Sequence, residues 1–480
     1  MRRFTVYDSL TREVRSFQPI HPPRVGMYVC GLTPYAPAHV GHARTFVFFD
    51  VVARALRRWG YRLFYVQNVT NLDDKLIERA GEEGIDPLVL AERHFLGYRL
   101  AMERLGVRSV NYYPFATDYL EEIVGQIRRL VDAGSAYRAD DGSVYFEVAK
   151  FPRYGRLSGQ STEALRPGAR IEVDRRKRAP EDFVIWKAAT PGEPSWESPW
   201  GPGRPGWHIE DTAITEQLLG ARYDLHGAAI DLIFPHHEAE VALAESATGK
   251  VPLVNYWMHG GLLRFSGEKM SKSLGNVVAL PDALDRWGPG PMRLFFVNVQ
   301  YRSPLEFDAE KSFAEATEAY RTLRQPLARL EELLARDGPD RAGAEPSPEL
   351  ADEAAALVER LDVTLANDFD TRGSVALLFG WSRRLSERPE LLDSLSGAGL
   401  ERLRAPYDWG REVLGLFEDS VPATSGTLRE VVEVAIAARS RARGRGDFAE
   451  ADRIRDELRR AGVTLEDHAG GTRWAVGSAG

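Results

Sequence analysis

The stretch GMYVCGLTPYAPAHVGHARTF, residues 26–46, decides the fold. Its first part, residues 26–31, is short and apolar, which predicts a buried strand. A helix is predicted from about His39 to Trp59, and the glycine that follows is suited to cap it. Residues 62–68 predict a second strand. Strand, helix and strand at this spacing form a βαβ unit of a parallel sheet, in which ligands bind at the loop after the first strand.

The composition limits the class of protein. The 480 residues are 44% hydrophobic and 28% charged, which is typical of a globular chain of several domains. A net charge of −8 argues against a uniformly cationic nucleic-acid coat, although a local basic patch remains compatible with it. Cys30 is the only cysteine, so no internal disulfide is expected. Without an apolar leader or a membrane-length apolar run, we expect a cytoplasmic protein with no membrane partner.

The rest of the chain contains further recognisable elements. Residues 117–133 are predicted to be helical, and residues 136–148 to form a hairpin that turns at Asp141-Gly142. The βα pattern resumes with a strand at Tyr223–His226 and a helix around Glu238–Ala247. Long, charged helical segments follow, and they predict a bundle before a small C-terminal module.

The HVGH sequence at residues 39–42 lies at the predicted start of the first helix. A helix N-terminus presents N–H groups that suit phosphate. Gly41 lets a flat group approach the backbone, and the imidazoles of His39 and His42 can donate to phosphate oxygens. By itself this pattern is as typical of a pair of surface histidines.

A second motif, SGEKMSKSLGN at residues 266–276, places Lys269 and Lys272 in a Gly/Ser-rich loop. Lysines in such a loop can neutralise charge that develops on transferring phosphates, although any single Lys-Ser tract is typical of a solvated loop. Together, the two motifs resemble the HIGH and KMSKS signatures of class I aminoacyl-tRNA synthetases. That family activates an amino-acid carboxylate with ATP on a Rossmann-like domain and passes the acyl group to tRNA.

Several further stretches narrow the resemblance to the cysteinyl-tRNA synthetase family, over nearly the whole chain. They are YVCG (28–31), FVFFDVVARALRRWGY (46–61), NVTNLDDKLI (68–77), RPGWHIE (204–210), DLHGAAIDLIFPHHEAE (224–240) and the C-terminal residues 439–474.

The resemblance implies an α/β fold: a Rossmann-like parallel-sheet catalytic domain with an insertion, then an α-helical bundle and a small C-terminal module. The expected parts are residues 1–116 (first half of the catalytic domain), 117–203 (insertion), 204–265 (second half), 266–307 (KMSKS loop and stem contact), 308–420 (bundle) and 428–480 (anticodon-binding module).

The resemblance also implies a zinc ion, about one per chain, that binds the substrate thiolate. The usual ligands are two Cys, one His and one Glu. Carried over, they are Cys30, His236 and Glu240, of which the last two are four residues apart on one helical face. The second Cys position holds Asp211.

Asp211 leaves two interpretations open. Zinc accepts carboxylate oxygen, and one anion replaces another, so the site keeps its formal charge. The harder donor makes the site less zinc-selective and leaves zinc a stronger Lewis acid toward a thiolate. Alternatively, Cys30 is an ordinary buried strand cysteine and Asp211 caps the following helix.

Other roles are carried over by position. We expect the triphosphate of ATP, with Mg²⁺, to be held by catalytic His39, His42, Lys269 and Lys272. The full expected ATP-binding set is His39, Gly41, His42, His259, Lys269 and Lys272, and the substrate-binding set is Thr70, Trp207, His226 and Asp231. Asp73 and Asp74 are interpreted as helix caps.

The C-terminal module is predicted to be a helix from Leu428 to Gly444, a turn, and a second helix that Asp447 caps with Glu450 in a capping box. Its apolar stripe is predicted to be Phe448, Ala451, Ile454 and Leu458. The expected tRNA contacts are Arg439, Arg441, Arg443 and Arg445 at phosphates and Trp474 at an unpaired base. The alternative is a solvated helical hairpin with a buried Trp.

The resemblance therefore implies ATP-dependent activation of L-cysteine and its transfer to the 3′ end of tRNA(Cys), by a monomer rather than an oligomer. Three alternatives stay open. They are a cysteine ligase with a small amine acceptor, similar to that of mycothiol synthesis, a paralogue that activates another amino acid, and a non-catalytic RNA-binding relative.

Overall fold

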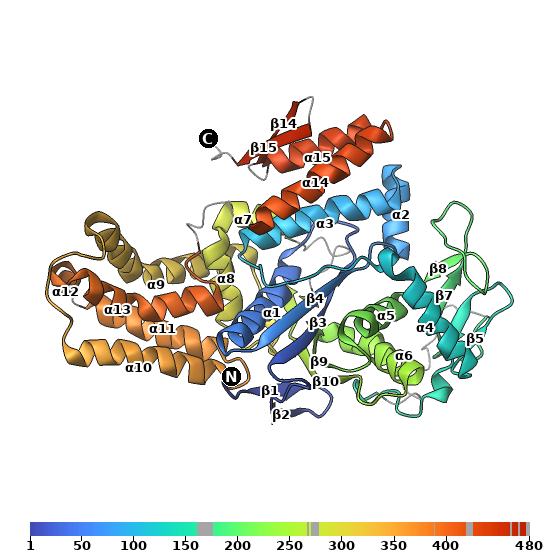
Figure 1. Cartoon of the computed structure of the whole chain (residues 1–480), viewed down its shortest axis with the longest axis horizontal. Coiled ribbons are helices and arrows are strands. Elements are labelled where there is room, and N and C mark those ends of the chain that lie inside the picture. Colours follow the sequence, from blue (N-terminus) through green and yellow to red (C-terminus); the bar gives the residue numbers. More distant parts are fainter. Residues whose placement is uncertain are drawn as a thin grey trace.

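In the computed structural model of the chain, a four-stranded parallel sheet forms the centre of the molecule (Figure 1). The structure describes residues 1–160, 176–265, 268–269, 278–387, 389–418, 426–460, 463–468 and 471–476. The strand order is β10-β9-β3-β4, with β3 at Arg24–Leu32, β4 at Arg62–Val69, β9 at Tyr223–Ala229 and β10 at Val254–Gly260. Within those residues, no helix combines the length and the apolar composition needed to cross a bilayer.

The predicted βαβ unit is confirmed. Helix α1 (Val40–Arg58) connects β3 to β4, and the two strands pair in parallel. The helix buries most of its apolar side chains, Phe46 and Phe49 among them, against the sheet. Gly60, just after the helix, has φ +88°, a left-handed conformation that glycine adopts without a steric penalty.

The insertion has a sheet of its own. The predicted hairpin is confirmed as β5 (Ala136–Arg138) and β6 (Val144–Phe146), which extend into an antiparallel sheet with β7 (Phe183–Ala188) and β8 (Gly203–Pro205). Helix α4 (Leu120–Asp132) precedes it, where a helix was predicted. The chain then returns to the central sheet through α5 (Trp207–Leu219), and α6 (Glu238–Thr248) connects β9 to β10.

Smaller elements complete the catalytic half. Strands β1 (Thr5–Asp8) and β2 (Glu13–Ser16) form an N-terminal hairpin, and β11 (Leu263–Phe265), β12 (Glu268–Lys269) and β13 (Leu305–Glu306) form a short sheet beyond β10. The helices are α2 (Asp74–Glu83), α3 (Pro87–Arg104), α7 (Leu280–Trp287) and α8 (Pro289–Val297).

Long helices form a bundle beside the central sheet, at the left of Figure 1. They are α9 (Ala309–Asp337), α10 (Pro348–Leu365), α11 (Thr371–Ser386), α12 (Pro389–Ser394) and α13 (Gly397–Trp409). Their buried leucines belong to the same apolar cluster as the α1 face of the sheet. The bundle is therefore continuous with the catalytic core.

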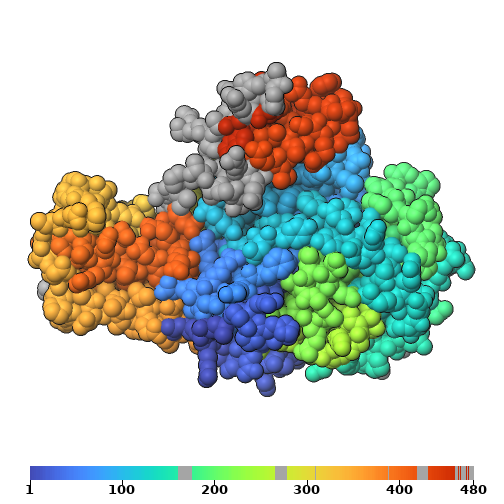
Figure 2. All heavy atoms as spheres, in the orientation of Figure 1, coloured from blue at the N-terminus to red at the C-terminus, as the bar shows by residue number. Residues whose placement is uncertain are grey.

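The C-terminal module packs on α3, as Figures 1 and 2 show. It consists of α14 (Gly426–Gly444), α15 (Phe448–Arg460) and an antiparallel hairpin of β14 (Val463–His468) and β15 (Gly471–Val476). Leu96 and Leu100 of α3 share an apolar cluster with side chains from both helices of the module. The sequence VPATSGT (421–427), rich in Pro, Ser, Thr and Gly, predicts a linker before this module, and residues 421–425 of it lie outside the described residues.

Two details of the module differ from expectation. Asp447 accepts the backbone N–H of Glu450 at 3.0 Å, as an N-cap does. The capping box is wrong, however, because the Glu450 carboxylate pairs with Arg453 instead of returning to Asp447. Phe448 is 63% exposed and does not belong to the apolar stripe, because the first turn of α15 projects it away from the core.

Asp50 of α1 joins several parts of the fold. Its carboxylate is fully buried and accepts from Arg54 at 2.7 Å and from the buried Arg293 of α8. Arg293 in turn donates to the backbone oxygen of Leu414, at the end of the bundle. Although burial raises the pKa of Asp50, these guanidinium groups outweigh it and hold the pKa far below its ordinary value. The ionised carboxylate thus connects the first helix to the bundle.

We expect Asp50→Asn to destabilise the chain by about 3–5 kcal/mol, because it leaves the buried guanidinium of Arg293 without its counter-charge. Chemical denaturation followed by circular dichroism would measure this change. Asp285→Asn is the matched control, since Asp285 pairs with Arg104 at an exposed site and such pairs contribute about 1 kcal/mol or less. Equal effects of both changes would contradict a special role for Asp50.

Candidate active site

A cavity of about 540 Å³ opens at the carboxyl ends of the central strands. This is where ligands bind in open parallel sheets. Its lining includes the following predicted site residues: Cys30, His39, Gly41, His42, Thr70, Trp207, Asp211, Asp231 and His236. The structure thus brings together residues that are far apart in the sequence.

The HVGH turn forms one wall of this cavity. His39 caps α1 in an extended conformation, and its backbone N–H donates to His42 Nδ1 at 3.3 Å. The two imidazole rings stack with centroids 3.8 Å apart. A Cβ atom at Gly41 would lie 2.9 Å from His39 Nδ1, so glycine is required for the ring to fold over the backbone. The close approach predicted for Gly41 is made by this ring.

The segment that follows the SGEKMSKSLGN motif is hydrogen-bonded to the segment that contains HVGH. The side chain of Lys269 and all of Lys272 lie outside what the structure describes. After the motif the chain resumes at Val278, whose backbone oxygen accepts from the N–H of Val40 at 3.1 Å. The N–H of Leu280 donates to Ala38 at 2.8 Å. The exit from the motif is therefore hydrogen-bonded to the HVGH turn.

Four potential metal ligands meet at the wall of the cavity. Their donor atoms all lie within 4.8 Å of one another, and all four residues are buried: Cys30 on β3, Asp211 on α5, His236 in the turn just before α6, and Glu240 in the first turn of α6. His236 Nε2 lies 3.0 Å from both Asp211 Oδ2 and Glu240 Oε1, and Cys30 Sγ lies 3.5 Å from Asp211 Oδ2 and 3.9 Å from Glu240 Oε1.

These separations fit a tetrahedral metal ion. Zinc bonds of about 2.0–2.3 Å place neighbouring ligand atoms about 3.3–3.6 Å apart. The four separations given above, 3.0–3.9 Å, bracket that range, and the remaining two pairs lie within 4.8 Å. Asp211 does not cap α5, because the helix begins at Trp207 with Gly206 as its N-cap. The alternative interpretation of Asp211 as a helix cap is therefore wrong.

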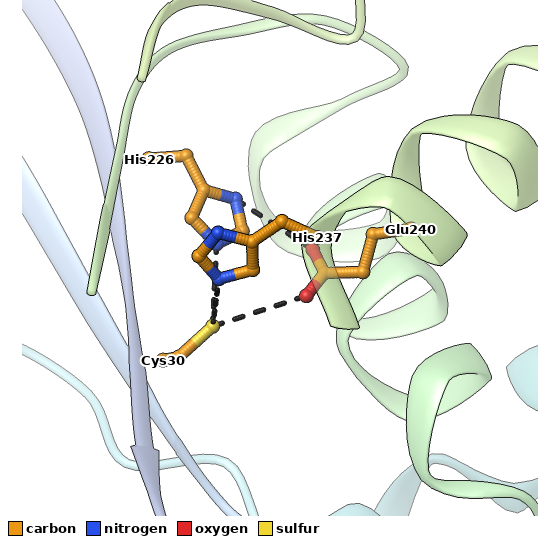
Figure 3. Close-up of side chains that lie close together, drawn as sticks. All are labelled: Cys30, His226, His237 and Glu240. Carbon is orange, nitrogen blue, oxygen red and sulfur yellow. Dashed lines mark hydrogen bonds and ion pairs between the residues drawn. The ribbon is translucent and has the colours of Figure 1, made fainter. Parts of the chain in front are cut away.

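Two more histidines, His226 and His237, lie close to the same sulfur (Figure 3). His226 Nε2 lies 3.3 Å and His237 Nε2 3.1 Å from Cys30 Sγ, and both residues form a second four-residue group with Cys30 and Glu240. Their outer nitrogens are already bonded, His226 Nδ1 to Tyr223 at 2.6 Å and His237 Nδ1 to His259 at 2.8 Å.

Access to the cavity distinguishes the two groups. Cys30, Asp211 and His236 line it, whereas His226 and His237 do not. A metal ion that contacts a substrate must keep a position open to it. The group that contains Asp211 meets this requirement. The imidazoles of His226 and His237 lie within hydrogen-bonding distance of the Cys30 sulfur without lining the cavity.

The electrostatics of the cluster call for a cation. Burial raises the pKa of the Cys30 thiol, and the carboxylates of Glu240 and Asp211 raise it further. Burial likewise raises the pKa of Glu240. Burial lowers the pKa of His236, but Glu240 and Asp211 outweigh it and raise the value to about 10. A proton on His236 thus supplies positive charge at the point where a metal ion would bind.

Three residues that the sequence interpretation missed hold the ligands in place. Asn68 Nδ2 donates to Asp211 Oδ1 at 2.7 Å, which leaves Oδ2 facing His236. His208 Nδ1 lies 2.8 Å from His236 Nδ1. His237 contacts Cys30, as described above. Histidine ligands are commonly oriented by such a partner on the outer nitrogen. Asn68 and His208 lie within the quoted motifs, which is the only sequence signal for them.

Two predicted site residues do not reach the cavity. His226 was expected to contact the substrate and His259 the adenine. Both are buried and absent from the cavity lining, because their strand positions point them toward the cluster behind Cys30. His259 bonds to His237 and to Ser9, and burial lowers its pKa to about 3. By contrast, Thr70 and Asp231 line the cavity, and Trp207 stacks on His236 with centroids 4.2 Å apart.

The predicted tRNA contacts are unequally accessible. Arg439 is buried, and its guanidinium forms two hydrogen bonds to Asp467, so it is not available to a phosphate. Arg441 and Arg443 are half-exposed and pair with Glu92 and Asp467, respectively, and Arg445 is exposed. Trp474 is partly buried against the module's apolar cluster, with its indole N–H bonded to Glu433.

Known protein families and curated relatives match this chain over nearly its whole length. Residues 16–318 match the tRNA synthetases class I (C) catalytic domain, and residues 426–474 match the cysteinyl-tRNA ligase anticodon binding domain. The cysteine–tRNA ligases of Pelotomaculum thermopropionicum and Alkalilimnicola ehrlichii are 43% and 44% identical to this chain over 484 and 476 residues. Each alignment covers 98% of this chain and 99% of the relative.

A solved structure supports the fold alone. The methionyl-tRNA synthetase of Mycobacterium tuberculosis, in complex with methionyl-adenylate, superposes with a TM-score of 0.62 at 17% identity. The match covers 86% of this chain and 94% of that chain. The predicted α/β fold, with its parallel sheet followed by helices, is confirmed.

After treatment with a chelator, we expect Cys30 to alkylate at least about tenfold more slowly than an ordinary thiol, because burial and a raised pKa both reduce the accessible thiolate. The rate should keep rising with pH beyond the pKa of a free cysteine. Iodoacetamide labelling followed by mass spectrometry gives one readout, since the chain has one cysteine. The unfolded chain is the control, and equal rates in both states would contradict the expectation.

Proposed function

The chain belongs to the cysteine–tRNA ligase family of class I tRNA synthetases, and from that premise we propose which of its residues carry each step. It activates L-cysteine with ATP and Mg²⁺ and transfers the cysteinyl group to tRNA(Cys). The small-acceptor alternative is not favoured, because residues 426–474 match an anticodon-binding domain. We further propose that the enzyme works in the cytoplasm, as its single cysteine and its tRNA substrate suggest.

The resident metal is zinc in this proposal, held by Cys30, Asp211, His236 and Glu240. The observation that carries it is the meeting of these four buried donors at the cavity wall, at tetrahedral separations. When bound, zinc supplies a Lewis acid that a thiolate coordinates far better than a hydroxyl. This accounts for the choice of cysteine over serine, which differs too little in shape to be rejected by a pocket alone.

Charge bookkeeping supports the same assignment. With both carboxylates ionised, a neutral Cys30 and a protonated His236 give the cluster a charge of −1. A dication bound to the Cys30 thiolate and a neutral His236 gives the same charge. The metal therefore replaces two protons without adding net charge to a buried site, which lowers the electrostatic cost of binding it.

The chain's own side chains then position the substrate. Trp207, stacked on His236, covers the edge of the metal site, and Thr70 lies where it can bond the substrate ammonium or carboxylate. Asp231, which also lines the cavity, suits the substrate ammonium or the ribose of ATP. His226 and His259 do not line the cavity and are not part of this set.

The chemistry needs no covalent enzyme intermediate. A carboxylate oxygen of cysteine attacks the α-phosphorus of ATP, and the bond to pyrophosphate breaks. His39, His42, Lys269 and Lys272 are proposed to neutralise the transferring phosphates. The tRNA 3′-terminal hydroxyl then attacks the carbonyl carbon of the adenylate and displaces AMP. The stacking of the His39 and His42 rings at the start of α1 supports their proposed role at the transferring phosphates.

The exposed side chains of the module are the ones available to tRNA. We propose Arg441, Arg443 and Arg445 as phosphate contacts but not Arg439, whose guanidinium is hydrogen-bonded to Asp467. Phe448, three residues after Arg445 in the sequence, adds an exposed ring that can stack on an unpaired base. Trp474 remains a proposed contact through the part of its ring that the apolar cluster leaves uncovered.

The zinc proposal predicts opposite results for two changes at Asp211. We expect Asp211→Ala to lose most of the metal and at least about tenfold in kcat/KM for cysteine, because a ligand and its charge disappear. Asp211→Cys should keep the metal and bind it more tightly against a chelator, since thiolate is the softer ligand. Elemental analysis, chelator competition and ATP–pyrophosphate exchange measure these quantities.

The matched control is Asp132→Ala, an exposed aspartate at the end of α4. It should change neither metal content nor exchange. Full zinc content in Asp211→Ala would remove Asp211 from the ligand set. Exchange with an amino acid other than cysteine in the unaltered chain would instead contradict the assigned substrate.

The anticodon proposal predicts a separation of the two half-reactions. Phe448→Ala with Arg445→Ala should raise KM for tRNA by about tenfold or more, since stacking contributes about 1–3 kcal/mol per base. Pyrophosphate exchange, which needs no tRNA, should stay unchanged. Val363→Ala, at an exposed apolar position of the bundle, is the control. An unaltered KM for tRNA would exclude this surface from tRNA binding.

A further inference from the structure

We propose that Lys75 binds a backbone phosphate of the tRNA 3′ end and so guides the acceptor strand into the cavity. The inference rests on the proposed function and adds a residue to it. Lys75 lies in the first turn of α2, just after β4, and it lines the cavity together with Thr70 and Tyr35. Its ammonium group is 5.8 Å from the centre of the Tyr35 ring, which keeps it near the cavity wall.

Lys75 is distinctive in its charge. Among the described residues that line the cavity, it is the only Lys or Arg. The carboxylates beside it in the sequence are engaged elsewhere. Asp73 caps α2 by accepting the N–H of Leu76 at 2.8 Å, and Asp74 pairs with Lys187 and Arg204 of the insertion. The ion pairs found among the described residues do not include Lys75. Asp73 interacts with it electrostatically but is engaged as the cap of α2, so Lys75 can still pair with a phosphate.

The sheet order indicates which ligand this is. Lys75 follows β4, at one edge of the sheet, whereas the KMSKS segment follows β10 and β11, at the opposite edge. The phosphates of ATP are expected between that far edge and the start of α1. Lys75 therefore lies at the edge of the sheet opposite the strands that lead into the KMSKS segment, and we assign it to a ligand other than the triphosphate.

The neighbours of Lys75 belong to the insertion. Through Asp74, the start of α2 is bonded to Lys187 on β7 and Arg204 on β8. Cations from two domains thus gather at the junction between α2 and the insertion. The unpaired 3′ end of a tRNA carries one negative charge per nucleotide and must reach the adenylate. A strand entering beside this junction would bring a phosphate to the ammonium group of Lys75.

The test separates the two half-reactions in Lys75→Ala. ATP–pyrophosphate exchange with cysteine should stay within about twofold of the unaltered enzyme. Single-turnover transfer from the preformed adenylate to tRNA should fall about tenfold or more at near-physiological salt, as expected for the loss of a charge-assisted contact. The salt dependence of tRNA binding should weaken by about 0.7 in the log–log slope, the contribution of one single-stranded phosphate contact.

Two further variants distinguish the loss of the Lys75 charge from a structural effect of the substitution. Lys75→Arg should restore most of the transfer rate, because it restores the charge, and a purely structural role would give no such rescue. Lys250→Ala, a change at an exposed lysine just after α6, should affect neither half-reaction. The metal content and the thermal unfolding midpoint of Lys75→Ala should match those of the unaltered enzyme.

Other outcomes would overturn the inference. A parallel fall in exchange and transfer would assign Lys75 to the ATP step instead. Unchanged transfer and an unchanged salt slope would remove it from ligand binding. Absence of cysteine-dependent exchange in the unaltered enzyme would contradict the proposed function itself, a result distinct from either of these.

Discussion

The parallel pairing of β3 with β9 is the constraint on which the site depends. Cys30 and His226 are 196 residues apart, and a whole inserted sheet lies between their strands. Only the register that sets Tyr28 against His226 brings the two halves of the catalytic domain together at the same edge. A shift of one residue would turn every side chain of the strand to the opposite face and remove Cys30 from the cluster.

The pairing of β3 with β4 fixes the orientation of the Asp211 carboxylate, which we propose as an oxygen ligand. A carboxylate has two oxygens and can rotate, so its orientation must be fixed from outside. Asn68 on β4 fixes this orientation. Its side-chain amide N–H donates to one oxygen of Asp211, and its side-chain oxygen accepts from the N–H of Gly31 at 2.7 Å. A Cβ at Gly31 would lie 1.7 Å from the backbone oxygen of Asn68, so the two strands can approach this closely only with glycine there.

What the sequence could predict divides along physical lines. The first βαβ unit and the insertion hairpin depend on local periodicity, and they were predicted correctly. The inward direction of His226 and His259 depends on which face of a strand is covered by other elements, and single-sequence patterns do not contain that information. Asn68 and His237 were missed for the same reason, since both act across strands or helices remote in the chain.

The apolar face that α3 presents to the C-terminal module has a consequence for biosynthesis. Leu96 and Leu100 are synthesised well before the helices that cover them, α14 and α15. Until those helices are made, the two leucines of α3 form an uncovered hydrophobic patch. Chains that terminate prematurely would keep that patch, which exposes them to aggregation and to chaperone or protease recognition. The two helices of the module therefore cover a surface that chaperones and proteases could otherwise recognise.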